Sequence, residues 1–73
     1  MTHPAMQAVT SSNVDSVGYD PHTRQLHVKF RGGGHYSYDD VTAQEHADLL
    51  DAKSIGAHLR AHVIAKHPHR KHK

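Results

Sequence analysis

The feature that most constrains the fold is the segment 25–31, in which apolar and polar residues alternate without exception. Leu26, Val28 and Phe30 fall on one side, and the histidine and cationic side chains fall on the other. This is the period of a strand with one buried face. Three consecutive glycines follow at 32–34, and they can supply the positive φ angles of a tight hairpin.

Two shorter segments, 14–19 and 35–39, also alternate and carry β-branched or aromatic residues. Asp20 and Pro21 separate the first of them from the central strand, since Asp favours the first position of a turn and Pro the second. We therefore predict a three-stranded antiparallel β-meander. On its polar side, His27 is expected to lie near His35 and Ser37 of the next strand.

The sequence from 42 onward predicts helices. Thr42 and Glu45 form the pattern of a capping box, which indicates a helix over 43–52. Ser54 is a suitable cap for a second helix over 56–67, which Pro68 ends. The predicted fold class is α+β, with the order β-β-β-α-α. The expected core consists of Val14, Val17, Tyr19, Leu26, Val28, Phe30, Tyr36, Tyr38, Val41, Ala47, Leu50, Ile55, Leu59 and Val63.

The chain is 73 residues long, which suits a single small domain. We place this domain at 13–67. Residues 1–12 are small, polar and aperiodic, and are expected to be a flexible leader. Residues 68–73 are basic with nothing apolar to bury, and are expected to be a flexible basic tail.

Short segments of the sequence, taken in order, carry a family resemblance. They are SSNV at 11–14, VGYD at 17–20, LHVKF at 26–30, GGHYSY at 33–38, Val41 and SIG at 54–56. In this order they resemble the KTSC domain, which occurs at the C-terminus of some lysyl-tRNA synthetases and as small stand-alone bacterial proteins. The resemblance implies an association with nucleic acid and supplies no catalytic residues. The chain differs from the family in having His58 and His62 where aromatic residues are common, and in its basic tail.

Charge is distributed unevenly along the sequence. Residues 1–52 carry three basic and seven acidic residues, a formal −4, whereas residues 53–73 carry six basic and no acidic residues, a formal +6, with five histidines. A cationic segment attracts polyanions, and counterion release from phosphates makes that attraction fall with salt. The predicted nucleic-acid contacts are Lys53, Arg60, Lys66, Arg70, Lys71 and Lys73, with Lys29 and Arg31 as secondary contacts.

These features predict a small, non-catalytic protein that binds DNA or RNA without sequence preference, through the second helix and the tail. Tyr36 and Tyr38 are assigned to the core rather than to a platform on which bases stack. The alternative function is a protein-interaction or self-association module with an acidic partner surface. A third interpretation is a solvated tail that only aids solubility. A homodimer fits as well as a monomer, because pairing would cover a sheet edge.

Other classes of site have little support. The sequence lacks a nucleophile elbow and the Lys-Ser/Thr of a phosphate-binding loop, so we expect no enzyme and no cofactor. It has no cysteine, which excludes disulfides and thiolate metal sites. His58 and His62 have a spacing that can chelate a divalent ion, but a closed site needs further ligands, and no specific metal is predicted.

The longest apolar run is three residues, and no secretory signal is visible, so we expect a cytoplasmic protein without a membrane span. The ten histidines add a dependence on pH. Their protonation would add positive charge to the cationic end of the chain. Polyanion binding is therefore expected to tighten as the pH falls from about 7.5 to 6.

Overall fold

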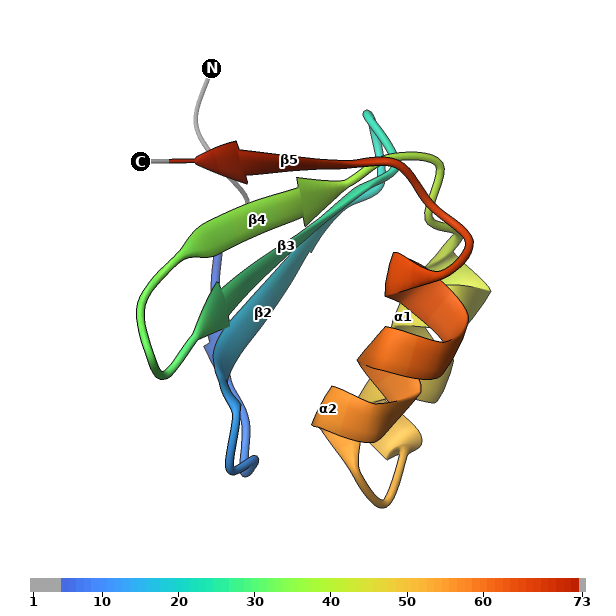
Figure 1. Cartoon of the computed structure of the whole chain (residues 1–73). Helices are drawn as coiled ribbons and strands as arrows, with labels where there is room; N and C mark the ends of the chain where they lie inside the picture. The colour runs from blue at the N-terminus through green and yellow to red at the C-terminus, as the bar shows by residue number, and fades with distance from the viewer. Residues whose placement is uncertain (1–4, 73) are drawn as a thin grey trace.

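The structure, a computed structural model, describes residues 5–72. One antiparallel sheet contains five strands in the order β1-β2-β3-β4-β5. They are β1 (Gln7–Ala8), β2 (Val14–Asp20), β3 (Gln25–Phe30), β4 (His35–Tyr38) and β5 (His69–His72). Between β4 and β5 lie helix α1 (Ala43–Asp51) and helix α2 (Ile55–His58), which continues as the π-helix η1 (Leu59–Ile64). Figure 1 shows the helices together on one face of the sheet.

The predicted three-stranded meander is wrong, because the sheet has five strands. The additional strands come from the segments expected to be the leader and the tail: β1 pairs with β2, and β5 pairs with β4. Neither has the alternation of a half-buried strand, since three of the four residues of β5 and both residues of β1 are exposed. Backbone hydrogen bonds to a neighbouring strand place these edge strands, and burial of side chains does not.

The two predicted turns connect the three central strands. The Asp20 carboxylate accepts a hydrogen bond from the backbone N–H of His22 at 2.9 Å, and this bond lowers the pKa of Asp20. In the second turn Gly33 and Gly34 have φ angles of 100° and 102°, which favour glycine. Both turns therefore form for the reasons that the sequence indicates.

The capping box of α1 is present and has a second role. Thr42 Oγ1 accepts a hydrogen bond from the Glu45 N–H at 3.1 Å, and Glu45 Oε1 accepts one from the Thr42 N–H at 3.1 Å. Glu45 Oε2 lies 2.7 Å from Nε2 of His67, just after the second helix. Burial raises the pKa of Glu45, but the hydrogen bonds from His67 and Thr42 outweigh it and hold this pKa below its ordinary value. One carboxylate thus joins the start of α1 to the end of the helical layer.

The core lies between the sheet and the helices, and it differs from the predicted one mainly in α1. Leu49 is fully buried, Leu50 is half-buried and Ala47 is exposed. The inward face of α1 runs through Glu45, His46 and Leu49: Glu45 contacts His67, and His46 stacks on Tyr19 with ring centroids 5.0 Å apart. The buried apolar residues are Val14, Val17, Leu26, Val28, Tyr38, Val41, Leu49, Ile55, Leu59 and Val63.

The aromatic residues are buried to different extents. Burial raises the pKa of Tyr38 to about 12. Tyr19, Phe30 and Tyr36 are only half-buried and pack against the margin of the core.

Helix η1 ends at Ile64, before the predicted end of the second helix. None of the helices within residues 5–72 is long and apolar enough to cross a bilayer.

Candidate nucleic-acid interface

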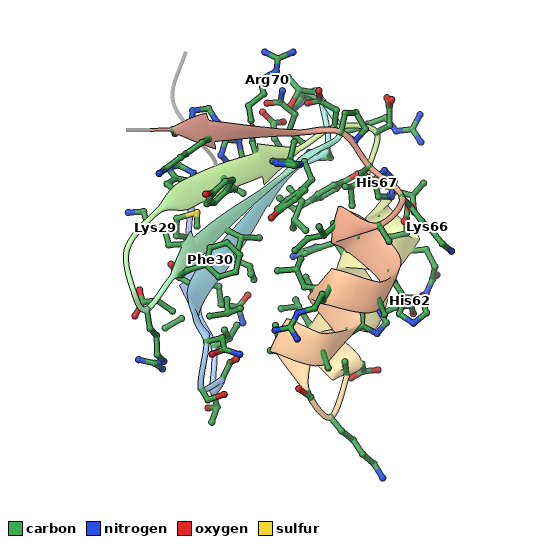
Figure 2. The ribbon with its side chains drawn as sticks, in the orientation of Figure 1. Lys29, Phe30, His62, Lys66, His67 and Arg70 are labelled. Atoms are coloured by element: carbon green, nitrogen blue, oxygen red, sulfur yellow. The ribbon has the colours of Figure 1, made fainter. Side chains whose placement is uncertain are left out.

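The sheet face opposite the helices carries most of the polar strand residues, and we call it the outer face. Residues directly paired in an antiparallel sheet point to the same side, so the register defines its members. Two rows cross β2 to β5: Ser16, Lys29, His35 and His72, then Gly18, His27, Ser37 and Arg70. A third, shorter row holds Asp20 and Gln25. Figure 2 shows Lys29 on the side of the sheet away from the helices, and Phe30 on the side toward them.

Three histidines from three strands form a cluster at the centre of the outer face. Nδ1 of His27 lies 2.9 Å from Nε2 of His35, and Nε2 of His72 lies 2.8 Å from Oγ of Ser37. The ring centroids of the three imidazoles are 4.8 to 5.6 Å apart. His27 is only 3% exposed, whereas His35 and His72 are half-buried. We call these three residues the histidine cluster.

Histidine is also a common metal ligand. Between residues 5 and 72, no group of three or more His, Asp or Glu side chains is arranged to hold a metal ion. The rings of His58 and His62 face one another on the second helix, with centroids 4.5 Å apart. In the arrangement observed, both sets of imidazoles are held by contacts within the protein.

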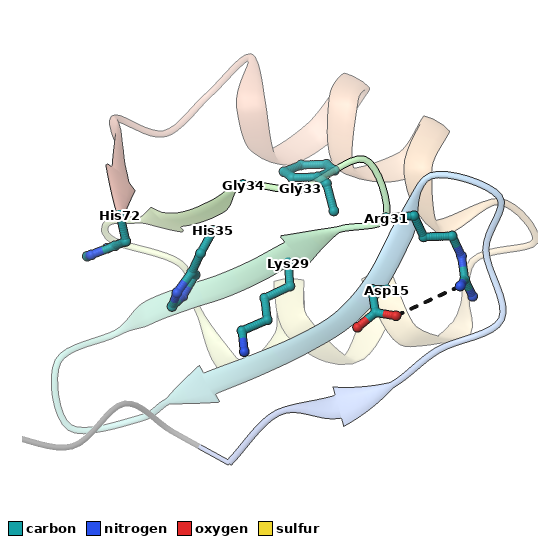
Figure 3. A pocket seen from close by; sticks show the side chains of 8 residues that line it. Asp15, Lys29, Arg31, Gly33, Gly34, His35 and His72 are labelled. Atoms are coloured by element: carbon teal, nitrogen blue, oxygen red, sulfur yellow. Dashed lines mark ion pairs between the residues drawn. The ribbon is translucent and has the colours of Figure 1, made fainter.

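A groove of about 440 Å³ lies beside the turn between β3 and β4, at one end of the outer face (Figure 3). We call it the hairpin groove. Four side chains that carry or can carry positive charge line it, together with one carboxylate. Its lining residues are Asp15, Lys29, Phe30, Arg31, Gly33, Gly34, His35 and His72.

A β-bulge in β2 positions Asp15, the acidic residue that lines the hairpin groove. Val14 pairs with Phe30 and Ser16 pairs with Lys29, so Asp15 is an extra residue without a partner in the ladder. Its carboxylate lies 3.8 Å from Nη1 of Arg31. Arg31 is further fixed because its Nε donates to the Ser11 carbonyl at 2.6 Å. The bulge thus brings one acid and one cation together at the edge of the groove.

The cations expected to contact nucleic acid are divided between two surfaces. Lys29 and Arg70 lie on the outer face, and Arg31 lies at its hairpin end. The cations of the helical layer, Lys53, Arg60 and Lys66, are exposed on the opposite layer of the molecule.

The tail does not present its cations together. Arg70 and Lys71 are adjacent in β5, so their side chains point to opposite sides of the sheet, with Lys71 opposite Tyr36. Lys73 lies outside the described residues. The second helix and the tail therefore do not present their cations on one continuous surface.

Acidic residues reduce the separation of charge that the sequence indicates. Nη2 of Arg70 lies 3.7 Å from a carboxylate oxygen of Asp39. Glu45 and Asp48 of α1 line a second groove, of about 240 Å³, together with His58, His62, Val63 and Lys66. Folding thus places carboxylates from the first 52 residues beside cations of the last third. In the described part of the chain, no acidic group lies within 4.0 Å of the charged nitrogens of Lys29, Lys53, Arg60, Lys66 or Lys71.

Sequence reasoning placed part of the outer face and missed the rest. Period-two alternation was sufficient to put His27 beside His35 and Ser37. It gave no signal for His72, because the segment that forms β5 has no apolar face. Asp15 was also missed, since a bulge changes the register without leaving a pattern in the residue types.

A family model and a crystal structure relate this chain to the same family, and two further proteins are similar in sequence. The family model of the KTSC domain matches residues 10–66 of this chain. A protein of Tsukamurella paurometabola is 43% identical over 51 residues, which cover 70% of this chain and 76% of the relative. A protein of Stutzerimonas stutzeri is 41% identical over 52 residues, which cover 71% of this chain and 73% of the relative. The crystal structure of a KTSC domain protein from Yersinia pestis matches with a TM-score of 0.92 and 34% identity, and covers 97% of this chain and 100% of that chain.

Proposed function

The chain belongs to the KTSC domain family, and we propose that it binds the phosphate backbone of nucleic acids through its outer face. One observation carries the proposal: a sheet face that none of the described helices covers, and over which Ala5 and Met6 pack only at Gly18 among the glycines, brings Lys29, Arg70 and the histidine cluster together from β3, β4 and β5. Cations on such a face can contact successive phosphates of one strand. A cytoplasmic location belongs to the same proposal.

The charges predict moderate affinity. The outer face and its rim carry Lys29, Arg31 and Arg70 against three carboxylates, those of Asp15, Asp20 and Asp39. Two or three phosphate contacts correspond to a slope of about −2 to −3 in a plot of log K against log salt concentration. Protonation of histidines adds positive charge to the protein, so we expect binding to tighten as the pH falls from about 7.5 to 6.

The aromatic residues support contact with the backbone and not with the bases. Tyr38 is buried, and Tyr36 lies on the helix side of the sheet. The Tyr36 ring packs edge-on against the ring of Phe30, with ring centroids 5.6 Å apart. Among the described residues, the rows of the outer face contain no Phe or Tyr on which bases could stack. We therefore propose binding without sequence preference and without catalysis. We expect a smaller contribution from the cations of the helical layer, because Lys66 shares its groove with the carboxylates of Glu45 and Asp48, although neither carboxylate forms an ion pair with it.

The test is a fluorescence anisotropy titration of single-stranded DNA, duplex DNA and a transfer RNA against wild-type protein and two variants. Lys29→Gln removes a cation from the outer face. Arg24→Gln is the matched control, because it also removes one exposed cation but lies at the other end of the β2–β3 hairpin. We expect Lys29→Gln to weaken binding by roughly threefold to tenfold at low salt and Arg24→Gln to have less than half that effect.

Two results would contradict the proposal. The first is the absence of binding to all three nucleic acids at low salt. The second is equal loss of affinity in the two variants, which would indicate attraction by net charge alone. Self-association, the alternative function, would appear as a dependence of the sedimentation coefficient on protein concentration without any nucleic acid.

A further inference from the structure

The hairpin groove differs from the rest of the outer face in its density of cationic groups. Lys29, Arg31, His35 and His72 all line it, whereas the second row of the outer face carries one cation, Arg70, which faces Asp39. A phosphodiester inside a strand carries a single negative charge. A phosphate monoester carries about −1.5 to −2 near neutral pH and offers three strong acceptor oxygens. The groove therefore suits a terminal phosphate better than an internal one.

Contacts within the protein hold the groups that line the groove. Arg31 is anchored by its backbone N–H, which donates to the Asn13 carbonyl at 2.8 Å, and by Nε, which donates to Ser11. Its guanidinium has five N–H donors, so these contacts leave donors for a ligand. His35 is positioned by buried His27 at 2.9 Å, and His72 by Ser37 at 2.8 Å. Little side-chain freedom is lost when an anion binds to groups already fixed in this way.

The size and borders of the groove fit the end of a strand. Its volume of about 440 Å³ lies within the usual range for small-ligand sites. The turn with Gly33 and Gly34 and the Asp15–Arg31 pair border it on the hairpin side (Figure 3). A groove of this volume can hold a terminal phosphate with part of its nucleotide.

We propose that the hairpin groove binds the terminal phosphate monoester of a nucleic-acid strand. This inference rests on the proposed function and deepens it, since it assigns one end of the outer face to the end of the strand. Lys29 and Arg31 contact the phosphate oxygens, and His35 and His72 line the same groove. Asp15 opposes the anion and competes with it for Arg31.

The experiment compares two ten-nucleotide DNA strands of one sequence, one with a 5′-phosphate and one with a 5′-hydroxyl, each labelled at the 3′ end. We expect the phosphorylated strand to bind about fivefold to tenfold more tightly. Lys29→Gln should reduce this ratio toward one, and Arg24→Gln should leave it unchanged. Asp15→Asn should raise it, because Asp15 is the only carboxylate among the described residues that line the groove.

Each outcome decides one of the two proposals. Equal binding of the two strands by wild-type protein overturns the assignment of the groove and leaves the proposed function in place. Binding of neither strand contradicts the proposed function. A third titration uses the 5′-phosphorylated mononucleotide alone. If it binds as tightly as the phosphorylated strand, the ligand is a free nucleotide, and the assignment to strand ends is wrong.

Discussion

Two surfaces of this small domain carry cations, and they differ in how folding assembles them. The cations of the helical layer, Lys53, Arg60 and Lys66, are close in sequence, yet the nearby α1 contributes Glu45 and Asp48 to the groove that contains Lys66. The outer face draws Lys29 from β3 and Arg70 from β5, which are far apart in sequence and separated by one strand in the sheet. A run of charge in a sequence is therefore a poor guide to a charged surface, because tertiary contacts bring in compensating groups.

The largest expected effect comes from charge reversal on each surface in turn. The double variant Lys29→Glu/Arg70→Glu should weaken binding of single-stranded DNA by about tenfold to a hundredfold at low salt, since it replaces two phosphate contacts by repulsion. Arg60→Glu/Lys66→Glu makes the same change of net charge on the helical layer, and its expected effect is about threefold or less. Anisotropy titrations measure both, with circular dichroism as the check on folding. Equal losses would remove the distinction between the surfaces.

The dependence of binding affinity on salt also distinguishes the outer face from the helical layer. Because each phosphate contact releases counterions, Lys29→Gln should reduce the steepness of the plot of log K against log salt by about one. Lys53→Gln, on the helical layer, should change that slope by less than half as much. Titrations at four salt concentrations give both values. The reverse order of effects would place the binding surface on the helices.

Removal of the Thr42 cap in the helical layer, by contrast, should change the stability of the protein and not its affinity for nucleic acid. Thr42→Ala removes the side chain that caps α1, and should lower the free energy of unfolding by about 1 kcal/mol. Urea denaturation measures this loss. The affinity for nucleic acid at a temperature well below unfolding should be unchanged. A parallel loss of affinity would show that α1 takes part in binding.

The smallest effect concerns acid stability. The pKa of Glu45 is below its ordinary value of 4.5 in the folded protein, so its contribution to stability is present above that pH and is lost as the pH falls through the folded-state pKa. Glu45→Gln cannot titrate. Although less stable at pH 7, this variant should lose less stability than wild type between pH 5 and about 3. Urea midpoints at several pH values test this, and parallel curves for the two proteins would contradict it.

The sequence was sufficient for the parts of the fold in which apolar side chains decide the structure. Alternation predicted β2, β3 and β4, and the Thr42–Glu45 pair predicted the start of α1. Strands β1 and β5 could not be found in this way, because edge strands with solvent on both faces need only backbone partners. Since β5 carries both Arg70 and His72, missing this strand left Arg70 in an expected flexible tail and gave no indication that His72 lies beside His35. The pairing of Arg70 with Asp39 depends on the same strand and was equally invisible.

We propose that the outer face, and not the helical layer, binds nucleic acid. The most direct measurement is a titration of isotope-labelled protein with a short single-stranded DNA at low salt, followed by the backbone amide shifts. We expect the largest shifts in β3, β4 and β5, at Lys29, His35, Arg70 and His72. These shifts should become smaller at higher salt. Shifts concentrated in α1, α2 and η1, with the strands unaffected, would contradict this proposal.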